Sequence, residues 1–222
     1  MNLFSTFDPS TMMKTSLNWL NMMMPLMIVP LLFWMIPSRT NFMWMMIMTK
    51  INNEFKIILK SKKMKGSTLM FLSFFTFILW CNTLSLYPYI FASTSHMVIT
   101  LAMALPLWLS FMIYGWLNNT QHMLAHLIPQ GTPPLLMPFM VCIETISNMI
   151  RPGTLAIRLT ANLIAGHLLL TLLGISALKM NETLIGILII VQMLLIILEY
   201  AVAMIQAYVF SILLTLYSSE VN

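Results

Sequence analysis

Apolar residues form five long blocks along the chain, and short polar stretches separate these blocks. A helix of about 20 apolar residues crosses the roughly 30 Å hydrocarbon core of a bilayer, and each block reaches that length. A closed β-barrel is the other architecture that spans membranes, but its strands alternate apolar and polar residues, and the blocks show no such alternation. We therefore expect an all-α integral membrane protein with a single membrane domain over residues 1–222. The blocks cover residues 17–36, 67–92, 96–117, 135–178 and 183–217.

The first three blocks predict ordinary membrane crossings. Residues 17–36 predict an upright first transmembrane helix; Lys14 precedes it as in a secretory signal, but the block is too long and no small-residue cleavage site follows. The next two blocks contain no Lys, Arg, Asp or Glu, and the short polar stretch 93–95 between them suits a tight connection. Residues 67–117 therefore predict a transmembrane helical hairpin.

The last two blocks are too long for upright helices. A helix of about 35 residues, as over 183–217, is roughly 52 Å long and would tilt by about 55° to fit the hydrocarbon core. Because ordinary transmembrane helices tilt by about 20°, residues 135–217 predict a pair of long, steeply inclined helices. Pro152 and Gly153 would allow a bend in the first of them.

Composition supports solvation by lipid, because the chain is 59% hydrophobic and only 8% charged. Seven of the eleven Lys and Arg residues lie in one stretch, residues 39–65. The positive-inside rule places this stretch on the side of synthesis and the N-terminus on the opposite side. Apolar residues recur there at three- and four-residue steps from Trp44 to Leu59, which predicts an amphipathic surface helix over 41–63, or alternatively an ordinary solvated helix. This concentration of charge argues against a nucleic-acid partner.

Polar residues inside the two long blocks are the candidates for chemistry, because a charge in the bilayer costs about 2.5 to 3.5 kcal/mol. In the first block they recur at steps of three, four or seven and share one helix face; in the second they are spaced by heptads. Such stripes predict a facing partner or a water-filled crevice, although hydrogen bonding to a neighbouring helix is the simpler interpretation for Ser147, Thr154 and Gln192. The first stripe is Glu144, Ser147 or Asn148, Arg151, Thr154, Arg158 and Asn162; the second is Gln192, Glu199 and Gln206.

No metal or other cofactor is expected. Residues 118–138 carry several Pro and Gly residues and predict a loop or re-entrant connection. Within it, His122 and His126 have the spacing of a metal pair but no third ligand nearby. Cys81 and Cys142 lie in different blocks without a CxxC pair, so we interpret them as packing residues.

Four segments resemble a known family in order and spacing. LAIRLTANLIAGH at 155–167 resembles the signature segment of the subunit a family of rotary ATP synthases. HLIPQGTP at 126–133, ETISN at 144–148 and EYAVAMIQAY at 199–208 resemble the mitochondrial branch, and the similarity extends over nearly the whole chain. The 24 Met residues also resemble a chain made inside mitochondria. The resemblance implies a non-catalytic proton-channel stator subunit of the mitochondrial inner membrane, with the N-terminus in the intermembrane space and residues 39–65 facing the matrix.

The resemblance also implies roles and partners. Arg158 would face the carboxylates on a rotor ring of small hairpin c-type subunits, and arginine suits this role because it stays protonated and cannot relay protons. His167 and Glu199 would form the outer access path for protons. Asn162 and Gln206 would line the site beside the arginine, and Glu144, with Ser147 and Asn148, would belong to the matrix-side exit. Arg151 is interpreted as a lipid-headgroup or interface residue. Peripheral-stalk and other membrane-sector subunits would be further partners.

The sequence argues against two other classes of function. A self-contained cation-coupled secondary transporter would show internal repeats and its own midplane carboxylates, and neither is apparent. A membrane metalloprotease using His122 and His126 would need an HExxH motif, which the sequence lacks. Nine residues separate Arg158 from His167, which is about half a turn of direction on a helix, so the two need not share one crevice. Distinct half-channels would fit this spacing.

Overall fold

The computed structural model describes residues 3–10, 15–30, 35–59, 66–128, 133, 136–177 and 181–221. Within these ranges the chain is helical and contains no strand. Four of the described helices are long and apolar enough to cross a membrane: α3 (Ser67–Ser85), α4 (Met97–Asn118), α6 (Met137–Ala177) and most of α7 (Glu182–Val221). The prediction of an all-α integral membrane protein is confirmed.

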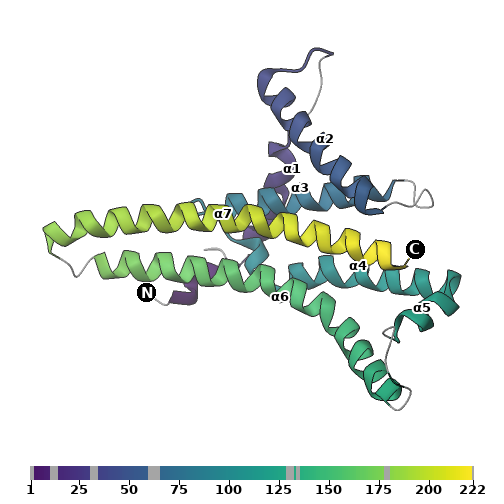
Figure 1. The fold of residues 1–222 in the computed structure, drawn as a ribbon. Coiled ribbons are helices and arrows are strands. Elements are labelled where there is room, and N and C mark those ends of the chain that lie inside the picture. Colours follow the sequence, from purple (N-terminus) through teal and green to yellow (C-terminus); the bar gives the residue numbers. More distant parts are fainter. Residues whose placement is uncertain are drawn as a thin grey trace.

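Helices α6 and α7 form the centre of the molecule and run antiparallel along much of their length (Figure 1). Helix α7 also packs against α3, and α6 packs against α4. The shared core includes Phe71, Leu159, Ala207 and Phe210. With 41 and 40 residues, each of the two helices is about 60 Å long, roughly twice the thickness of a hydrocarbon core. Their steep inclination in a bilayer stays a prediction.

Helix α6 is bent, so that its first part leaves α7 and only the later part runs beside it (Figure 1). Pro152 lies inside this helix and is buried. Proline has no backbone N–H, and its ring collides with the carbonyl of the preceding turn, which bends a helix at that point. The bend therefore has a local cause in the sequence.

The N-terminal region is less helical than predicted. Over the predicted first transmembrane helix, 17–36, the described helical turns are η2 (Leu17–Met23) and α1 (Met24–Ile28), after an initial turn η1 (Leu3–Phe7). Val29 has an extended ψ of 121° because it precedes Pro30, which disfavours the helical conformation of its neighbour. Residues 31–34 lie outside the described part.

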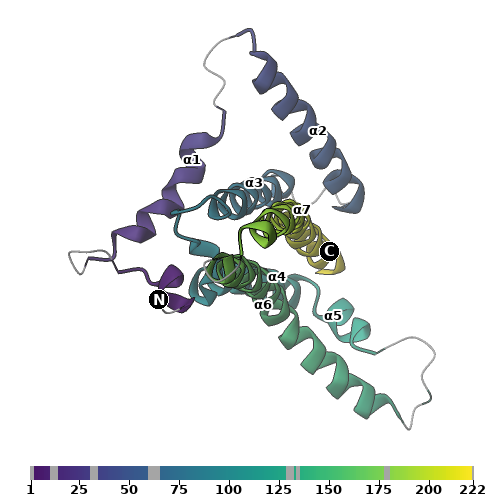
Figure 2. The ribbon, with the colours of Figure 1, turned by 90° about the vertical axis from the view of Figure 1, so that its left-hand side faces the viewer.

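Helix α2 (Arg39–Leu59) occupies most of the predicted amphipathic stretch 41–63 and projects from the body of the molecule (Figure 2). Its apolar face packs inward through Phe55 and Leu59, while Lys56 is exposed. The rings of Trp44 and Trp80 lie 5.6 Å apart and connect it to α3. Residues 60–65, with four of the predicted basic side chains, lie outside the described residues.

The connection inside the predicted hairpin and the connection that follows the hairpin both differ from the prediction. Helix α3 ends at Ser85, ahead of Pro88, and residues 86–92 form a turn in which Tyr89 has a positive φ of 68°. A short turn, η3 (Ser93–Ser95), then leads into α4. The predicted loop 118–138 contains a short helix, α5 (Thr120–His126), because its first helix breaker is Pro129. Within 129–135 only residue 133 is described.

Candidate functional site

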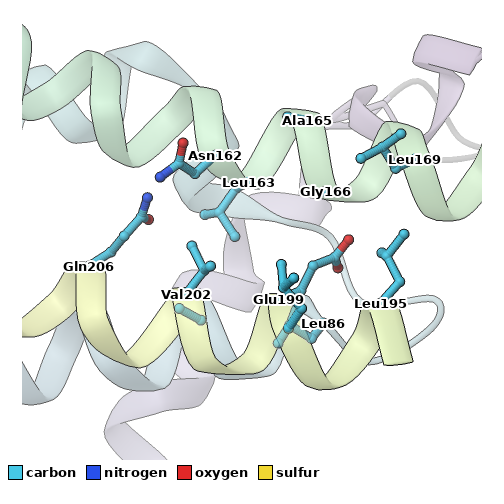
Figure 3. Close-up of a pocket in the computed structure, with 12 residues that line it drawn as sticks. Leu86, Asn162, Leu163, Ala165, Gly166, Leu169, Leu195, Glu199, Val202 and Gln206 are labelled. Atoms are coloured by element: carbon cyan, nitrogen blue, oxygen red, sulfur yellow. The ribbon is translucent and has the colours of Figure 1, made fainter. Parts of the chain in front are cut away.

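Glu199 of α7 is buried against the backbone of α6. Its side chain is only 9% exposed and reaches toward Gly166 (Figure 3). A Cβ atom at Gly166 would lie 2.8 Å from both Cδ and Oε1 of Glu199. The absence of a side chain at this one position therefore makes room for the carboxyl group between the two helices.

The carboxyl group of Glu199 borders a cavity of about 370 Å³ between α6 and α7. Most of the lining is apolar, and Asn162 and Gln206 are its other polar members. Neither carboxyl oxygen of Glu199 has a hydrogen-bond partner among the residues that the structure describes. Since a buried polar group without a partner is costly and water occupies about 30 Å³ per molecule, this cavity is suited to ordered water at Glu199.

His167 borders a different and larger cavity of about 720 Å³. This cavity, which we name the outer vestibule after the outer access path that the resemblance implies, lies between α6, α7, the turn after α3 and the N-terminal segment. Gln192 also lines it. The Nε2 atom of His167 is buried and has no hydrogen-bond partner among the described residues. His167 and Glu199, which the resemblance assigns to one access path, therefore make no direct hydrogen bond through Nε2. They lie at neighbouring cavities that share the lining residue Leu86.

Arg158 lies on an exposed face of α6. Its backbone carbonyl accepts a hydrogen bond of 3.2 Å from Nε2 of Gln206, which fixes the main chain of α6 to α7. In the described part of the chain, no acidic side chain forms an ion pair with its guanidinium. The neighbouring positions on the same face, Ala161, Asn162 and Ala165, are also exposed. The hydrogen bond therefore holds the backbone of Arg158 against α7, while the exposed side chain can contact another molecule.

Asn162 and Gln206, which the resemblance assigns to the surroundings of Arg158, lie on facing sides of α6 and α7. Figure 3 shows their amide ends pointing toward one another across the gap between α6 and α7. Gln206 is buried, whereas Asn162 is exposed. Gln206 also lines a small second cavity together with Arg158. Two neutral amides can orient the arginine and hydrogen-bond water without adding a charge.

A charged cluster lies at the other end of the α6–α7 pair. Nη1 of Arg151 donates to Oε2 of Glu220 over 2.9 Å, and Nη2 lies 3.5 Å from Oε1 of Glu144. The guanidinium also lies 5.5 Å from the centre of the Tyr217 ring, within the range of a cation–π interaction. Asn148 lines a small cavity at this cluster. Arg151, interpreted from the sequence as a headgroup or interface residue, instead joins two acids of the same chain.

Apart from Arg158 on the exposed face of α6, the predicted residues lie in three places. His167 and Gln192 face the outer vestibule, and Glu199, Asn162 and Gln206 face the cavity between the helices. Glu144 and Asn148 belong to the charged cluster, with Ser147 half-buried on the same part of α6.

Sequence reasoning missed two residues, Gly166 and Glu220. Glu220 is one of only six acidic residues, and antiparallel pairing of the last two blocks brings it near Arg151, so a signal existed. Gly166 stands inside a helix, where glycine is unfavourable, which is the signal of a close approach. Among the described residues, no three His, Cys, Asp or Glu side chains are placed to hold a metal ion.

Comparison with known proteins gives one consistent answer. The family described as ATP synthase A chain matches residues 11–219. The chain is 60% identical over 221 residues to ATP synthase subunit a of Drosophila melanogaster, covering 100% of this chain and 99% of the relative. It is 59% identical over 223 residues to ATP synthase subunit a of Anopheles gambiae, with the same coverage, and 59% identical over 221 residues to that of Locusta migratoria, covering 99% and 98%. These matches extend along the whole chain, and the chain belongs to the ATP synthase subunit a family.

Proposed function

We propose that this chain is the proton-translocating stator subunit in the membrane sector of an F-type ATP synthase of the mitochondrial inner membrane. The observation that carries the proposal is Arg158. A permanent cation inside an apolar helix costs about 2.5 to 3.5 kcal/mol in a bilayer unless an anion pairs with it. No acid of the described chain forms an ion pair with Arg158, and this residue is exposed, so the pairing carboxylate belongs to another polypeptide.

The partner proposed for Arg158 is the carboxylate of a c-type subunit in a rotor ring. An unchanging positive charge favours the ionised form of each carboxylate that passes, and so releases its proton. Because arginine does not give up its own proton, it also blocks direct passage of protons between the two sides. The exposed Ala161 and Ala165 next to it support a helix partner, since small side chains let helices approach closely in membranes.

Two separate groups of residues would give protons access to this arginine. On the outer side, the vestibule leads to His167, and the neighbouring cavity leads past Glu199 to Asn162 and Gln206. On the matrix side, Glu144, Arg151 and Glu220 mark the exit. Histidine and a carboxyl group can both exchange protons near neutral pH when partly desolvated. The arginine stands between the two groups, which supports two half-channels.

The subunit would carry protons and leave the ATP chemistry to other subunits. Its sequence has no GxxxxGK[ST] phosphate loop. The basic stretch 39–65 favours a matrix location for that stretch and an intermembrane-space location for the N-terminus. The exposed apolar residues along α7, such as Ile190, Leu194 and Ile197, fit lipid or neighbouring membrane-sector and peripheral-stalk subunits.

The test is Arg158→Gln in the intact complex, with Lys56→Gln as the matched control that removes an exposed cation elsewhere. We expect the complex to assemble and to co-migrate with ATP-hydrolysing subunits in mild detergent, while ATP synthesis driven by an imposed proton gradient falls to background. Each proton crossing 100 mV releases about 2.3 kcal/mol, so even partial loss of coupling is measurable as lost synthesis. Full coupled synthesis in Arg158→Gln, or a chain that migrates alone, contradicts the proposal.

A further inference from the structure

The N-terminal segment, residues 3–10, lies beside α6 (Figures 1 and 2). Several of its residues line the outer vestibule. A residue of the α3–α4 hairpin holds this segment in place. The carbonyl oxygen of Phe7 accepts a hydrogen bond of 3.0 Å from Nε2 of His96. The His96 ring in turn lies 5.2 Å from the rings of both Trp19 and Phe91. Because the anchor uses a backbone atom and packed aromatic rings, the segment has a defined position on the molecule.

Phe7 connects this segment to the candidate proton path. Its ring stands edge-on to the ring of His167, with the ring centres 6.2 Å apart and the planes at 90°. This is the favoured edge-to-face geometry of aromatic pairs. Phe7 is half-buried, whereas Phe4, three residues earlier in the same turn, is 68% exposed. The Phe7 ring therefore contacts the His167 ring, whose buried Nε2 atom has no hydrogen-bond partner among the described residues.

Polar side chains of the segment line the same cavity as His167. Ser5, Asp8 and Ser10 line the outer vestibule of about 720 Å³ that contains His167. The backbone N–H of Ser10 donates to Oδ1 of Asp8 over 3.0 Å, and Asn18 donates to the backbone carbonyl of Asp8 over 3.4 Å. The segment therefore presents polar groups to the cavity and an aromatic ring to α6.

We propose that residues 3–10 form a fixed wall of the water-filled vestibule through which protons reach His167, and that Phe7 is the positioning residue for the His167 ring. The inference rests on the proposed function, because it assigns part of the outer access path. It adds a segment far from α6 and α7 in sequence to that path. An edge-to-face contact of this kind corresponds to about a two- to tenfold preference for the held orientation of the ring.

The first experiment tests the wall. Ser10→Cys is placed in the intact complex in vesicles whose outer face is accessible, in a Cys142→Ser background, because Cys142 is exposed and Cys81 is buried. A membrane-impermeant thiol reagent is added from the outer side. We expect labelling of Ser10→Cys to reduce proton uptake at least fivefold relative to the same complex without reagent. Phe4→Cys is the matched control, because Phe4 is exposed but does not line the vestibule; its labelling should change uptake less than twofold.

Three results would contradict the proposal that residues 3–10 form a wall of the vestibule. They are complete labelling of Ser10→Cys without loss of uptake, no labelling of Ser10→Cys from the outer side, and an equal loss on labelling Phe4→Cys. If Ser10→Cys prevents assembly, Asp8→Cys gives the same test from the same cavity. The function itself is judged separately by Arg158→Gln, so either idea can fail while the other stands.

The second experiment tests the positioning role of Phe7. Phe7→Leu keeps an apolar side chain but removes the ring edge, and Phe7→Tyr keeps the ring. We expect proton uptake from the outer side to fall about two- to tenfold in Phe7→Leu and to be restored in Phe7→Tyr, with equal amounts of assembled complex. Equal uptake in Phe7→Leu and the parent, or equal loss in Phe7→Leu and Phe7→Tyr, would show that Phe7 does not position His167.

Discussion

Replacing Gly166 by Ala should move the Glu199 carboxyl group while leaving the stability of the protein almost unchanged. The added Cβ would lie 2.8 Å from Cδ and Oε1 of Glu199, whereas ordinary contact begins near 3.4 Å, so the carboxyl group must retreat by about 0.6 Å. That group is the end of a flexible side chain, and a side-chain torsion turned by about 30° costs roughly 0.5 to 1.5 kcal/mol. Alanine regains about 0.8 to 1.0 kcal/mol of helix propensity over glycine. The net change in folding free energy is therefore close to zero.

The functional effect of this shift should be much larger. Misplacing a reacting group by about 1 Å can lower a rate roughly a hundredfold, so a shift of about 0.6 Å should lower proton uptake on the order of tenfold. Uptake is measured as ATP synthesis by the intact complex in vesicles at a fixed imposed proton gradient. Native electrophoresis and the ATP hydrolysis of the complex report assembly, and both should match the parent.

Gly174→Ala provides the matched control on the same helix. A Cβ atom there meets no heavy atom within 4 Å, so the variant gains helix propensity without displacing any group. Its proton uptake should equal that of the parent. Unchanged uptake in an assembled Gly166→Ala complex would refute the role assigned to the close approach of Glu199, and an equal loss in both variants would refute the steric reasoning.

Three more outcomes are expected. Glu199→Gln keeps the shape of the side chain but cannot carry a proton, so uptake from the outer side should fall on the order of a hundredfold; equal flux at every outer pH would remove Glu199 from the path. A double-mutant cycle of Arg151→Gln and Glu220→Gln, followed by thermal unfolding of the complex, should give a coupling of about 0.2 to 1 kcal/mol, because both side chains are partly exposed; a coupling of zero would contradict the ion pair. The Ser10 N–H holds the pKa of Asp8 below its usual 3.8, so the stabilisation by this contact is present above that value and lost as pH falls through the lower, folded value. Asp8→Asn should therefore change proton uptake by the same factor at every outer pH from about 5 to 8, and a titration step unique to the parent would contradict this.

The long helices could be predicted from sequence because the bilayer imposes one simple condition on them. Unbroken apolar runs must be helical where no water satisfies the backbone, and α6 and α7 follow the apolar blocks within a few residues. Pro152 also predicts the bend in α6. Near the N-terminus the same argument predicted too much helix, because Pro25 and Pro30 interrupt the apolar run and local backbone preferences override its length.

Motif and polar periodicity predict Arg158, His167 and Glu199 as site residues, since a polar residue in an apolar helix stands out. Their functional roles stay a prediction, and their arrangement could not be predicted from the sequence. Neither the motif nor the polar periodicity carries information about contacts between segments that are distant in the sequence. The approach of Phe7 to His167 and of Glu220 to Arg151 depends on how separate segments pack, which single-residue patterns do not encode.

The length of α6 bears on how a voltage could become rotation. About 35 Å of helix axis separates Glu144 from His167 on this one element, which exceeds the thickness of the hydrocarbon core. Under the proposed function, an inclined α6 would displace the proposed inner and outer access sites sideways along the circumference of the rotor ring. A proton that entered at one site would then leave at the other only after moving with the ring, and the direction of the inclination would set the sense of rotation. An upright α6 would place the two sites one above the other, and the same voltage would exert no torque.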